Sequence, residues 1–469
     1  MKSVLVLGLS LLWSVAAAAA AAAGDASPNL TPAMLSTVQK LMQEARRANA
    51  AYAIVESLTT EVGPRLAGTE AEGRARQWAV AKLNALGFHN VRVESFQVPV
   101  WVRGSESAQI VAPSPQSLTI TALGGSASTG VEGVTAEVVS FASLAALQSA
   151  PVDQVRGKIV FVEEPMARTK DGAGYGVAVA KRRLTAYEAQ RLGASAALIR
   201  SVGTSSHRFA HTGQMRRVTE QGESGVPTAA LSAPDADQLM RLLSRGKPVV
   251  MKVVITAQKL PPAESGNVIA EIPGSAVPDE VVLVGAHLDS WDLGTGAIDD
   301  GAGVGIVVAA AKLLMDELPR APRRTIRVVL FGSEEVGLVG AQAYARQHAT
   351  ELPLHIVATE SDFGAGDIWR FDTGVAEEKI AMASAIGDVL HPLGVAAGNN
   401  NATGGPDIKY LREAGVPVVG LKQNGLDYFD LHHTADDTLD KISPDSLNQN
   451  VAAYAAFLYL AAEMTGKLR

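Results

Sequence analysis

Short apolar runs alternate with helical segments along most of the chain. Runs rich in valine, isoleucine and leucine occupy residues 281–286, 325–331 and 354–358. Such runs, which do not alternate with polar positions, are typical of strands buried on both faces of a parallel sheet. Apolar residues at helical spacing occupy 299–319 and 337–349. This alternation predicts an α/β fold in which a mostly parallel central sheet carries helices on both faces.

The front of the chain and its middle differ in texture. Residues 31–103 predict helices and then a strand, whereas residues 104–260 are rich in Gly, Ser, Ala and Thr and contain short β-like runs. The middle therefore favours an inserted β-rich domain, and KLPPAESGN is the expected return linker. We expect four parts, which are a signal peptide at 1–23, a first α/β part at 24–103, the insertion at 104–260 and a second α/β part at 261–469.

The N-terminus predicts export. Lys2 precedes the apolar run VLVLGLSLLW and an alanine-rich stretch that ends near Ala23, which is the order of a cleaved secretory signal peptide. A retained membrane anchor is the alternative, because the stretch approaches the roughly 20 residues that span a bilayer. We expect cleavage, and therefore a periplasmic or secreted protein with no membrane attachment afterwards.

Composition narrows the chemistry. The formal net charge of −7 argues against nucleic acid as a partner, because phosphate binding needs basic surface. The chain has no cysteine, so thiolate zinc sites, disulfides and cysteine nucleophiles are excluded together. Histidine and carboxylate side chains remain as the strong metal ligands.

Residues of that kind follow the three buried runs. His287 and Asp289 end the first run, Glu334 and Glu335 the second, and Asp362 the third, while the loop AIDDGAG carries Asp299 and Asp300. Ligands of open α/β sheets bind beyond the carboxyl ends of the strands, where all of these residues fall. Taken singly, each acid is better explained as a helix cap or a solvated loop residue. The joint pattern, with the later motif LHHTADDT, favours a two-metal hydrolase site.

Two zinc ions need a bridging carboxylate and further ligands on each side. Asp299 suits the bridge, because it lies in a glycine-bounded turn at the start of a helix. One ion would then take His287 and Asp362, and the other Glu335 and His433. Glu334 is left as a general base, and Asp289 is expected to accept a hydrogen bond from the second ring nitrogen of His287 and so orient it.

The segments HLDS, DDGAG, GSEEVGLVGA, ESD and HHTADDT together resemble the co-catalytic zinc exopeptidases, a family that includes bacterial leucyl aminopeptidases and glutamate carboxypeptidase II. The resemblance extends to GPRLAGTEAEGRARQWAVAKLNALGF, and GKIVF, LGASAALI and VPTAALS resemble a protease-associated domain. The insertion, with the ESD and HHT variants, is most similar to the carboxypeptidase Q branch.

The resemblance implies five zinc ligands, a catalytic acid/base at Glu334, a cis peptide between Asp299 and Asp300, and a homodimer. The implied ligands are His287, Asp299, Glu335, Asp362 and His433. Family spacing before the Asp–Thr pair selects His433 over His432. The implied activity is zinc-dependent hydrolysis of short peptides at one end.

Aminopeptidase or dipeptidase action is preferred over carboxypeptidase action, because an acidic site suits a free amine whereas a terminal carboxylate needs a cationic clamp. Lys409, Arg412 and Lys422 are available for a clamp but are expected to be solvated charges. A non-catalytic receptor and a one-zinc glutaminyl cyclase are further alternatives.

Two stretches near His433 are expected to line the substrate cleft because of their nearness in the chain. They contribute the candidate substrate residues Asn400, Asn401, Tyr428 and His432. His207 and His211, at i and i+4 in a loop-like segment, are expected to be solvated.

Overall fold

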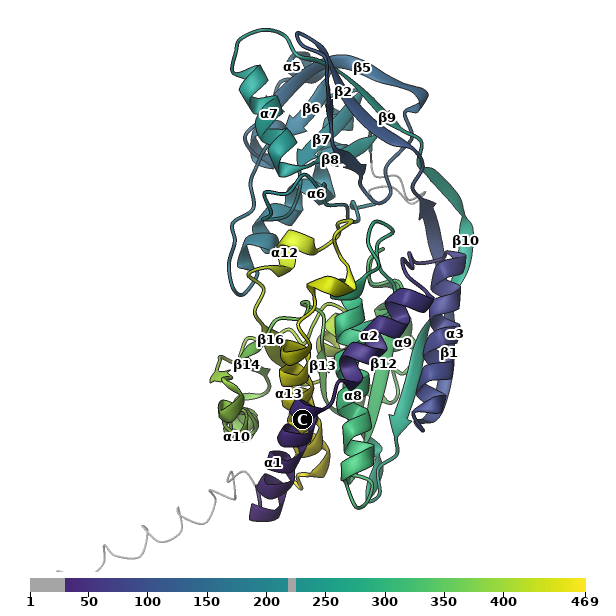
Figure 1. The fold of residues 1–469 in the computed structure, drawn as a ribbon, viewed down its shortest axis with the longest axis vertical. Coiled ribbons are helices and arrows are strands. Elements are labelled where there is room, and N and C mark those ends of the chain that lie inside the picture. Colours follow the sequence, from purple (N-terminus) through teal and green to yellow (C-terminus); the bar gives the residue numbers. More distant parts are fainter. Residues whose placement is uncertain (1–29, 218–224) are drawn as a thin grey trace, which may run out of the picture.

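The computed structural model describes residues 30–217 and 225–469 and contains two sheets (Figure 1). The expected signal peptide at 1–23 lies outside the described residues. No helix within the described residues is long and apolar enough to cross a membrane.

The first sheet has eight strands, and its centre is parallel. Strands β12, β11, β13 and β16 run parallel, whereas β1, β10 and β14 pair antiparallel with their neighbours toward the edges. In spatial order the strands are β1 (His89–Val102), β10 (Gln258–Ile272), β12 (Arg324–Phe331), β11 (Val277–His287), β13 (His355–Glu360), β16 (Val418–Gln423), β14 (Ile368–Gly374) and β15 (Ala396–Ala397).

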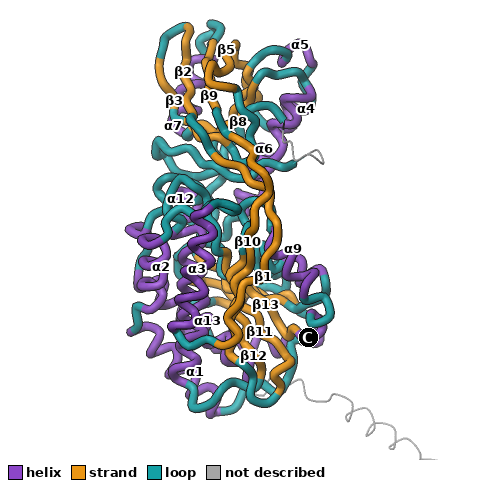
Figure 2. Tube along the Cα trace, turned by 90° about the vertical axis from the view of Figure 1, so that its right-hand side faces the viewer, coloured by secondary structure: helices purple, strands orange, loops and turns teal. Residues whose placement is uncertain are grey.

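Helices cover both faces of this sheet, as the alternating pattern predicts. One face carries α1 (Pro32–Arg47), α2 (Ala50–Glu61), α3 (Glu70–Ala85), α8 (Ala302–Glu317), α10 (Ile380–Val389) and α13 (Pro444–Glu463). The other face carries α9 (Val339–Gln347) and α11 (Lys409–Glu413). Figure 2 shows α9 on the opposite side of the sheet from α1, α2, α3 and α13. Central strands are buried on both sides, which explains why their sequences do not alternate.

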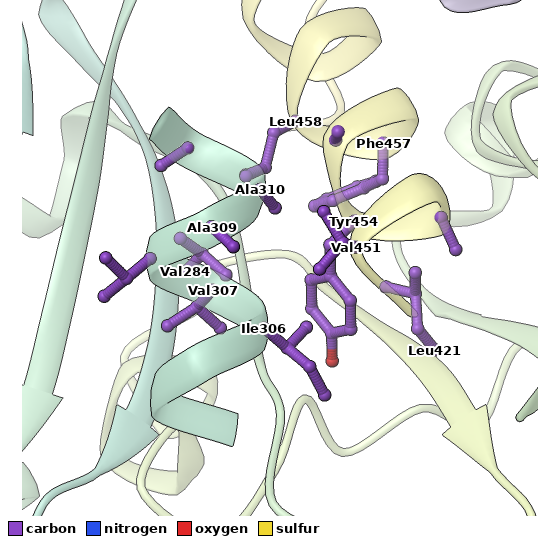
Figure 3. Close-up of a cluster of buried hydrophobic side chains, with 14 of the residues drawn as sticks. Val284, Ile306, Val307, Ala309, Ala310, Leu421, Val451, Tyr454, Phe457 and Leu458 are labelled. Atoms are coloured by element: carbon purple, nitrogen blue, oxygen red, sulfur yellow. The ribbon is translucent and has the colours of Figure 1, made fainter. Parts of the chain in front are cut away.

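The larger core lies under α8 and α13 (Figure 3). Val284 of β11 packs with Ile306 and Val307 of α8 and with Phe457 of α13 in one buried cluster. The Tyr454 hydroxyl donates a hydrogen bond of 2.9 Å to the Glu360 carbonyl, the last residue of β13. Packing of α13 therefore also holds the strand end from which Asp362 follows.

The second sheet contains eight strands from residues 106–255. Their order is β3 (Gln116–Leu118), β2 (Glu106–Ala112), β9 (Val250–Ile255), β5 (Gly130–Phe141), β6 (Ile159–Val162), β7 (Ala196–Arg200), β8 (Thr228–Leu231) and β4 (Ile120–Ala122). Its helices are α4 (Leu144–Gln148), α5 (Val152–Val155), α6 (Ala173–Arg191) and α7 (Ala233–Leu243). We call residues 106–255 the second lobe and the described residues on either side of them the main lobe.

Strands β1 and β10 join the two lobes as a ribbon (Figure 2). KLPPAESGN, the expected return linker, joins the lobes as part of β10, where Ala263 pairs with Val98 and Leu260 with Val100. The register shifts between these two pairs, at Pro261 and Pro262, which have no amide hydrogen to donate. The proline signal therefore marks an irregularity in an edge ribbon and not a loop.

Short elements complete the described chain. They are α12 (Tyr428–Leu431), the π-helical turn η1 (Ala297–Gly301) and the 3₁₀ turns η2 (Leu352–Leu354), η3 (Glu377–Lys379), η4 (His391–Leu393) and η5 (Leu439–Lys441). Helix α12 lies between the lobes (Figure 1).

Candidate metal centre

Three neighbouring strand ends deliver polar side chains to one edge of the first sheet. His287 is the last residue of β11, Glu334 and Glu335 follow β12, and Asp362 follows β13. The three strands are adjacent and parallel, so their carboxyl ends meet. The polar residues that follow the apolar runs in the sequence therefore lie close together in the structure.

Asp299 reaches the same place from η1, directly before α8. The peptide between Asp299 and Asp300 is cis, as the family resemblance implies. Asp437 accepts hydrogen bonds from the amides of Ile298 at 2.6 Å and Asp299 at 3.3 Å. Asp300 accepts from the His287 amide at 3.1 Å. The turn is thus tied both to the end of β11 and to the segment that follows His433.

The Asp299 carboxylate lies between two histidines. Its Oδ1 is 3.0 Å from Nε2 of His287, and its Oδ2 is 3.3 Å from Nε2 of His433. Asp362 Oδ1 is 3.5 Å from the His287 nitrogen, and Glu335 Oε2 is 3.0 Å from the His433 nitrogen. The five residues form two groups of donor atoms that share Asp299.

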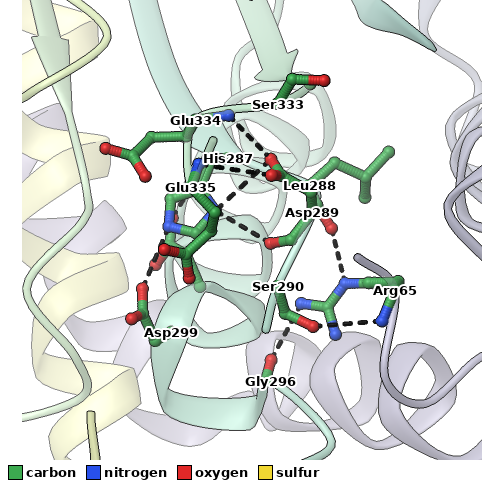
Figure 4. Close-up of polar contacts among 12 residues, drawn as sticks. Arg65, His287, Leu288, Asp289, Ser290, Gly296, Asp299, Ser333, Glu334 and Glu335 are labelled. Atoms are coloured by element: carbon green, nitrogen blue, oxygen red, sulfur yellow. Dashed lines mark hydrogen bonds and ion pairs between the residues drawn. The ribbon is translucent and has the colours of Figure 1, made fainter. Parts of the chain in front are cut away.

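Asp289 acts differently from the sequence expectation. The Nδ1 atom of His287 is 2.9 Å from the backbone carbonyl of Asp289 but 3.9 Å from its carboxylate. The carboxylate instead accepts hydrogen bonds from the amides of Glu334 at 3.0 Å and Glu335 at 3.3 Å (Figure 4). Because the strand turns after His287, the main chain takes the orienting position and the side chain holds the Glu334–Glu335 turn.

Arg65 is a buried organising residue that the sequence reasoning missed. Its side chain donates hydrogen bonds to the carbonyls of Leu288 at 2.5 Å and Gly296 at 2.9 Å (Figure 4). It also donates to the Thr295 carbonyl at 2.7 Å. It therefore ties the end of β11 to the turn that carries Asp299. The sequence feature that could have indicated a buried arginine is its position in the apolar, glycine-rich stretch GPRLAG.

The second lobe contacts the histidine pair. His433 Nδ1 is 3.2 Å from the Thr212 carbonyl and 3.3 Å from the Arg182 guanidinium. The Thr212 amide donates back to the His433 carbonyl at 3.0 Å. Thr212 belongs to the loop after β7 and Arg182 to α6, so residues far apart in the chain surround His433.

His211 is buried, which corrects the expectation of a solvated histidine. Its side chain is 2% exposed, and its Nδ1 lies 2.7 Å from the His432 carbonyl. Burial lowers the pKa of His211 to about 4. The neutral ring therefore donates to the loop that carries His432 and His433. His207, in the same segment, is exposed as expected.

The crowded carboxylates of the cluster shift the pKa values of its residues. Burial raises the pKa of Glu334 well above its usual range, and the Asp362 and Glu335 carboxylates raise it further. Burial lowers the pKa of His433, but Glu335 and Asp299 outweigh it and bring that pKa to about 9. Such a cluster favours positive charge in its centre.

The donor set fits zinc, which binds histidine nitrogen and carboxylate oxygen. Ligand atoms of His287, Asp299 and Glu335 lie within 4.8 Å of one another, as do those of Asp299, His432 and His433. Asp299 Oδ2 and Glu335 Oε1 are buried and accept no hydrogen bond. Buried carboxylate oxygens normally have a partner, so a cation is the fitting one here.

A cavity of about 840 Å³ opens over the cluster. Glu334, Tyr428 and His432 line it, and so does Arg182 of the second lobe. Asn400 and Asn401 are absent from its lining. The Asn400 amide group instead closes a turn through hydrogen bonds with Thr373 and Val375, so the wall comes from the later residues 403–406.

The chain is similar in sequence to known peptidases. The model of peptidase family M28 matches residues 267–458. Carboxypeptidase Q of Rattus norvegicus is 37% identical over 416 residues, covering 89% of this chain and 86% of that protein. Aminopeptidase YwaD of Bacillus subtilis is 26% identical and covers 66% of this chain and 59% of its own length.

A solved structure extends the likeness to both lobes. The peptidase M28 precursor from Shewanella amazonensis has a TM-score of 0.90 at 49% identity, covering 93% of this chain and 98% of that one. The strand ends that carry the donor cluster fall within the stretch that the family model matches, and the curated relative spans nearly the whole chain. The chain therefore belongs to peptidase family M28.

Proposed function

We propose that the protein is a zinc-dependent exopeptidase that binds two zinc ions and hydrolyses short peptides. The observation that carries this proposal is the position of Asp299 between His287 and His433, with one carboxylate oxygen toward each. Asp362 completes the ligand set beside His287, and Glu335 completes the set beside His433. Zinc held there supplies Lewis acidity, which polarises the scissile carbonyl and lowers the pKa of water.

Glu334 is the general base and acid of this proposal. It lines the cavity, and its backbone amide is fixed by Asp289 while its carboxylate points away from that contact (Figure 4). Burial raises the pKa of Glu334, and a carboxylate with a raised pKa accepts a proton from water more readily before returning it to the leaving amine. The carboxylate is thereby available to substrate without being a ligand.

The substrate end is proposed to be the free amine. Asp299, Glu335 and Asp362 are zinc ligands in this proposal, which leaves Glu334 and Glu360 as the other carboxylic acids that line the cavity. A substrate ammonium can be held beside these two groups, which supports aminopeptidase or dipeptidase action over carboxypeptidase action. A periplasmic or secreted location, after cleavage of the expected signal peptide, and a homodimer belong to the same proposal.

Hydrolysis of a peptide panel tests the proposal. The zinc-loaded protein is incubated with dipeptides and tripeptides whose N-termini are free or acetylated, and the products are separated by chromatography. We expect cleavage of the free peptides and none of the acetylated ones. Efficient cleavage of the acetylated series would move the assignment to carboxypeptidase action, and inertness toward every peptide despite two bound zinc ions would refute the exopeptidase proposal.

A further inference from the structure

Lys422 departs from the expectation of a solvated surface charge. It lies on β16, two strands from the end of β11, and its side chain is partly buried and lines the cavity over the donor cluster. The next residue, Gln423, is turned into the protein, where it donates to the Gly364 carbonyl at 2.8 Å. Lys422 and Gln423 both contribute to the cavity lining, and of the two only Lys422 carries a charge.

The Lys422 ammonium has no protein partner among the described residues. The carboxylates of Asp372 and Asp171 are the two that interact electrostatically with the Lys422 ammonium. Asp372 already accepts from the Arg370 guanidinium at 2.9 Å and from the Asn399 amide at 3.0 Å. Asp171 accepts from the Ala173 amide at 3.1 Å. Burial, opposed only in part by Asp372, lowers the pKa of Lys422.

Of the other cations that line the cavity, Lys409 and Arg182 have partners. Lys409 is 46% exposed, its ammonium is 4.0 Å from the Glu413 carboxylate, and it lies over the Tyr410 ring. Arg182 donates to the Tyr175 hydroxyl at 2.5 Å and faces His433. Lys422 therefore differs from both, because its charge is partly withdrawn from water and has no ion pair, which costs free energy unless a ligand supplies the missing anion.

We propose that Lys422 binds a carboxylate of the peptide substrate. The proposal rests on the exopeptidase function and deepens it by naming the residue that recognises a carboxylate of the substrate. Lys422 would hold the substrate carboxylate on the cavity wall while the scissile peptide bond lies over the donor cluster. The carboxylate is either the C-terminus of a dipeptide or an acidic side chain, and the two sources are distinguishable with amidated peptides.

The experiment compares Lys422→Met, Lys422→Arg and the control Lys409→Met, each loaded with zinc, on four substrates. These are alanyl-alanine, alanyl-alaninamide, glutamyl-alaninamide and glutaminyl-alaninamide. We expect the wild type to prefer the member of one pair that has the extra carboxylate by roughly 10-fold or more in kcat/KM, chiefly through KM, because a charged hydrogen bond contributes at that scale. Lys422→Met should abolish the preference, whereas Lys422→Arg and Lys409→Met should keep it.

The pair that shows the preference identifies the source of the carboxylate. Loss of preference on the first pair assigns Lys422 to the C-terminus, and loss on the second pair assigns it to an acidic side chain. Lys422→Met should also unfold at the same temperature as the wild type or higher, since it removes a partly buried charge that has no ion pair. Identical substrate ratios in Lys422→Met and wild type would overturn the Lys422 proposal alone, whereas inertness of the zinc-loaded wild type toward all four peptides would overturn the exopeptidase function and the Lys422 proposal with it.

Discussion

The two histidines of the donor cluster are held by different parts of the molecule. His287 ends β11, and its contacts with Asp300 and with the Asp289 carbonyl all come from the main lobe. His433 follows α12 and faces the Thr212 carbonyl of the second lobe. One half of the cluster is thus built by the register of a sheet, and the other by an interface between lobes.

The interface also fixes the segment that precedes His433. The Thr204 amide donates to the Phe429 carbonyl at 3.0 Å, and Arg168 of the second lobe forms an ion pair of 2.6 Å with Asp430. With the bond between His211 and the His432 carbonyl, these contacts make the second lobe part of the site's construction. Substitutions at the lobe interface are therefore expected to disturb the His433 half while the sheet stays intact.

Replacing Asp299 should have the largest effect, because it faces both halves. We expect Asp299→Ala to lose both zinc ions and to reduce peptide hydrolysis on the order of 1,000-fold or more. Elemental analysis after gel filtration and a peptide assay measure the two effects. Asp440→Ala, at an exposed acid away from the cluster, is the control. Two ions retained by Asp299→Ala would show that this carboxylate is not the bridge.

Replacing one histidine should separate the halves. His287→Ala and His433→Ala are each expected to keep one zinc ion and to lose activity on the order of 100-fold, because the remaining donors still form half of the site. Zinc titration with a competing chelator resolves the remaining affinity in each variant. Simultaneous loss of both ions in either variant would contradict two separable halves.

Perturbing the lobe interface should weaken the His433 half alone. His211→Ala removes the donor to the His432 carbonyl, and we expect the affinity of one zinc ion to fall roughly 10-fold, as is usual when a residue that orients a ligand is removed. The exposed His207 of the same segment gives the matched control, His207→Ala. An equal loss of affinity for both zinc ions in His211→Ala would show that the interface does not act on the His433 half alone.

Acidification should loosen the same contact. The pKa of His211 is about 4 in the folded chain against an ordinary value of 6.5, so the unfolded chain binds the proton first as pH falls. The stability contributed by neutral His211 is therefore complete above pH 6.5 and is lost as pH falls toward 4. Urea unfolding of wild type and His211→Gln, which does not titrate there, should converge over that window. Parallel curves would show that His211 does not titrate as expected.

The sequence predicted the proximity of the residues at the strand ends better than the contacts that surround them. His287, Glu335 and Asp362 follow apolar runs, and parallel strands place their ends together, so residue type and position were sufficient. Nothing local signals the contact of Arg182 with His433, which are 251 residues apart. His211 and Lys422 were misjudged for the same reason, because their burial comes from other elements and leaves no periodicity in their own segments.

Expectations based on nearness in the chain failed in a related way. Asn400 lies close to the cavity-lining residues in sequence, but its side-chain amide forms hydrogen bonds with Thr373 and Val375 instead. The segment KLPPAESGN was expected as the return linker because of its prolines and polar residues, and it does join the lobes, but as part of β10 paired with β1. Pairing between distant segments decides such cases, and composition does not report it.

Zinc content and turnover of Glu334→Gln test the central claim most directly. Glu334 is proposed to move a proton and not to hold metal, and removing a general base of this kind reduces turnover by about 100- to 10,000-fold. We predict a variant with two zinc ions per chain, wild-type affinity for a short peptide by calorimetry, and turnover reduced by that factor. Wild-type turnover, or loss of zinc together with activity, would contradict the division of roles between Glu334 and the five ligands.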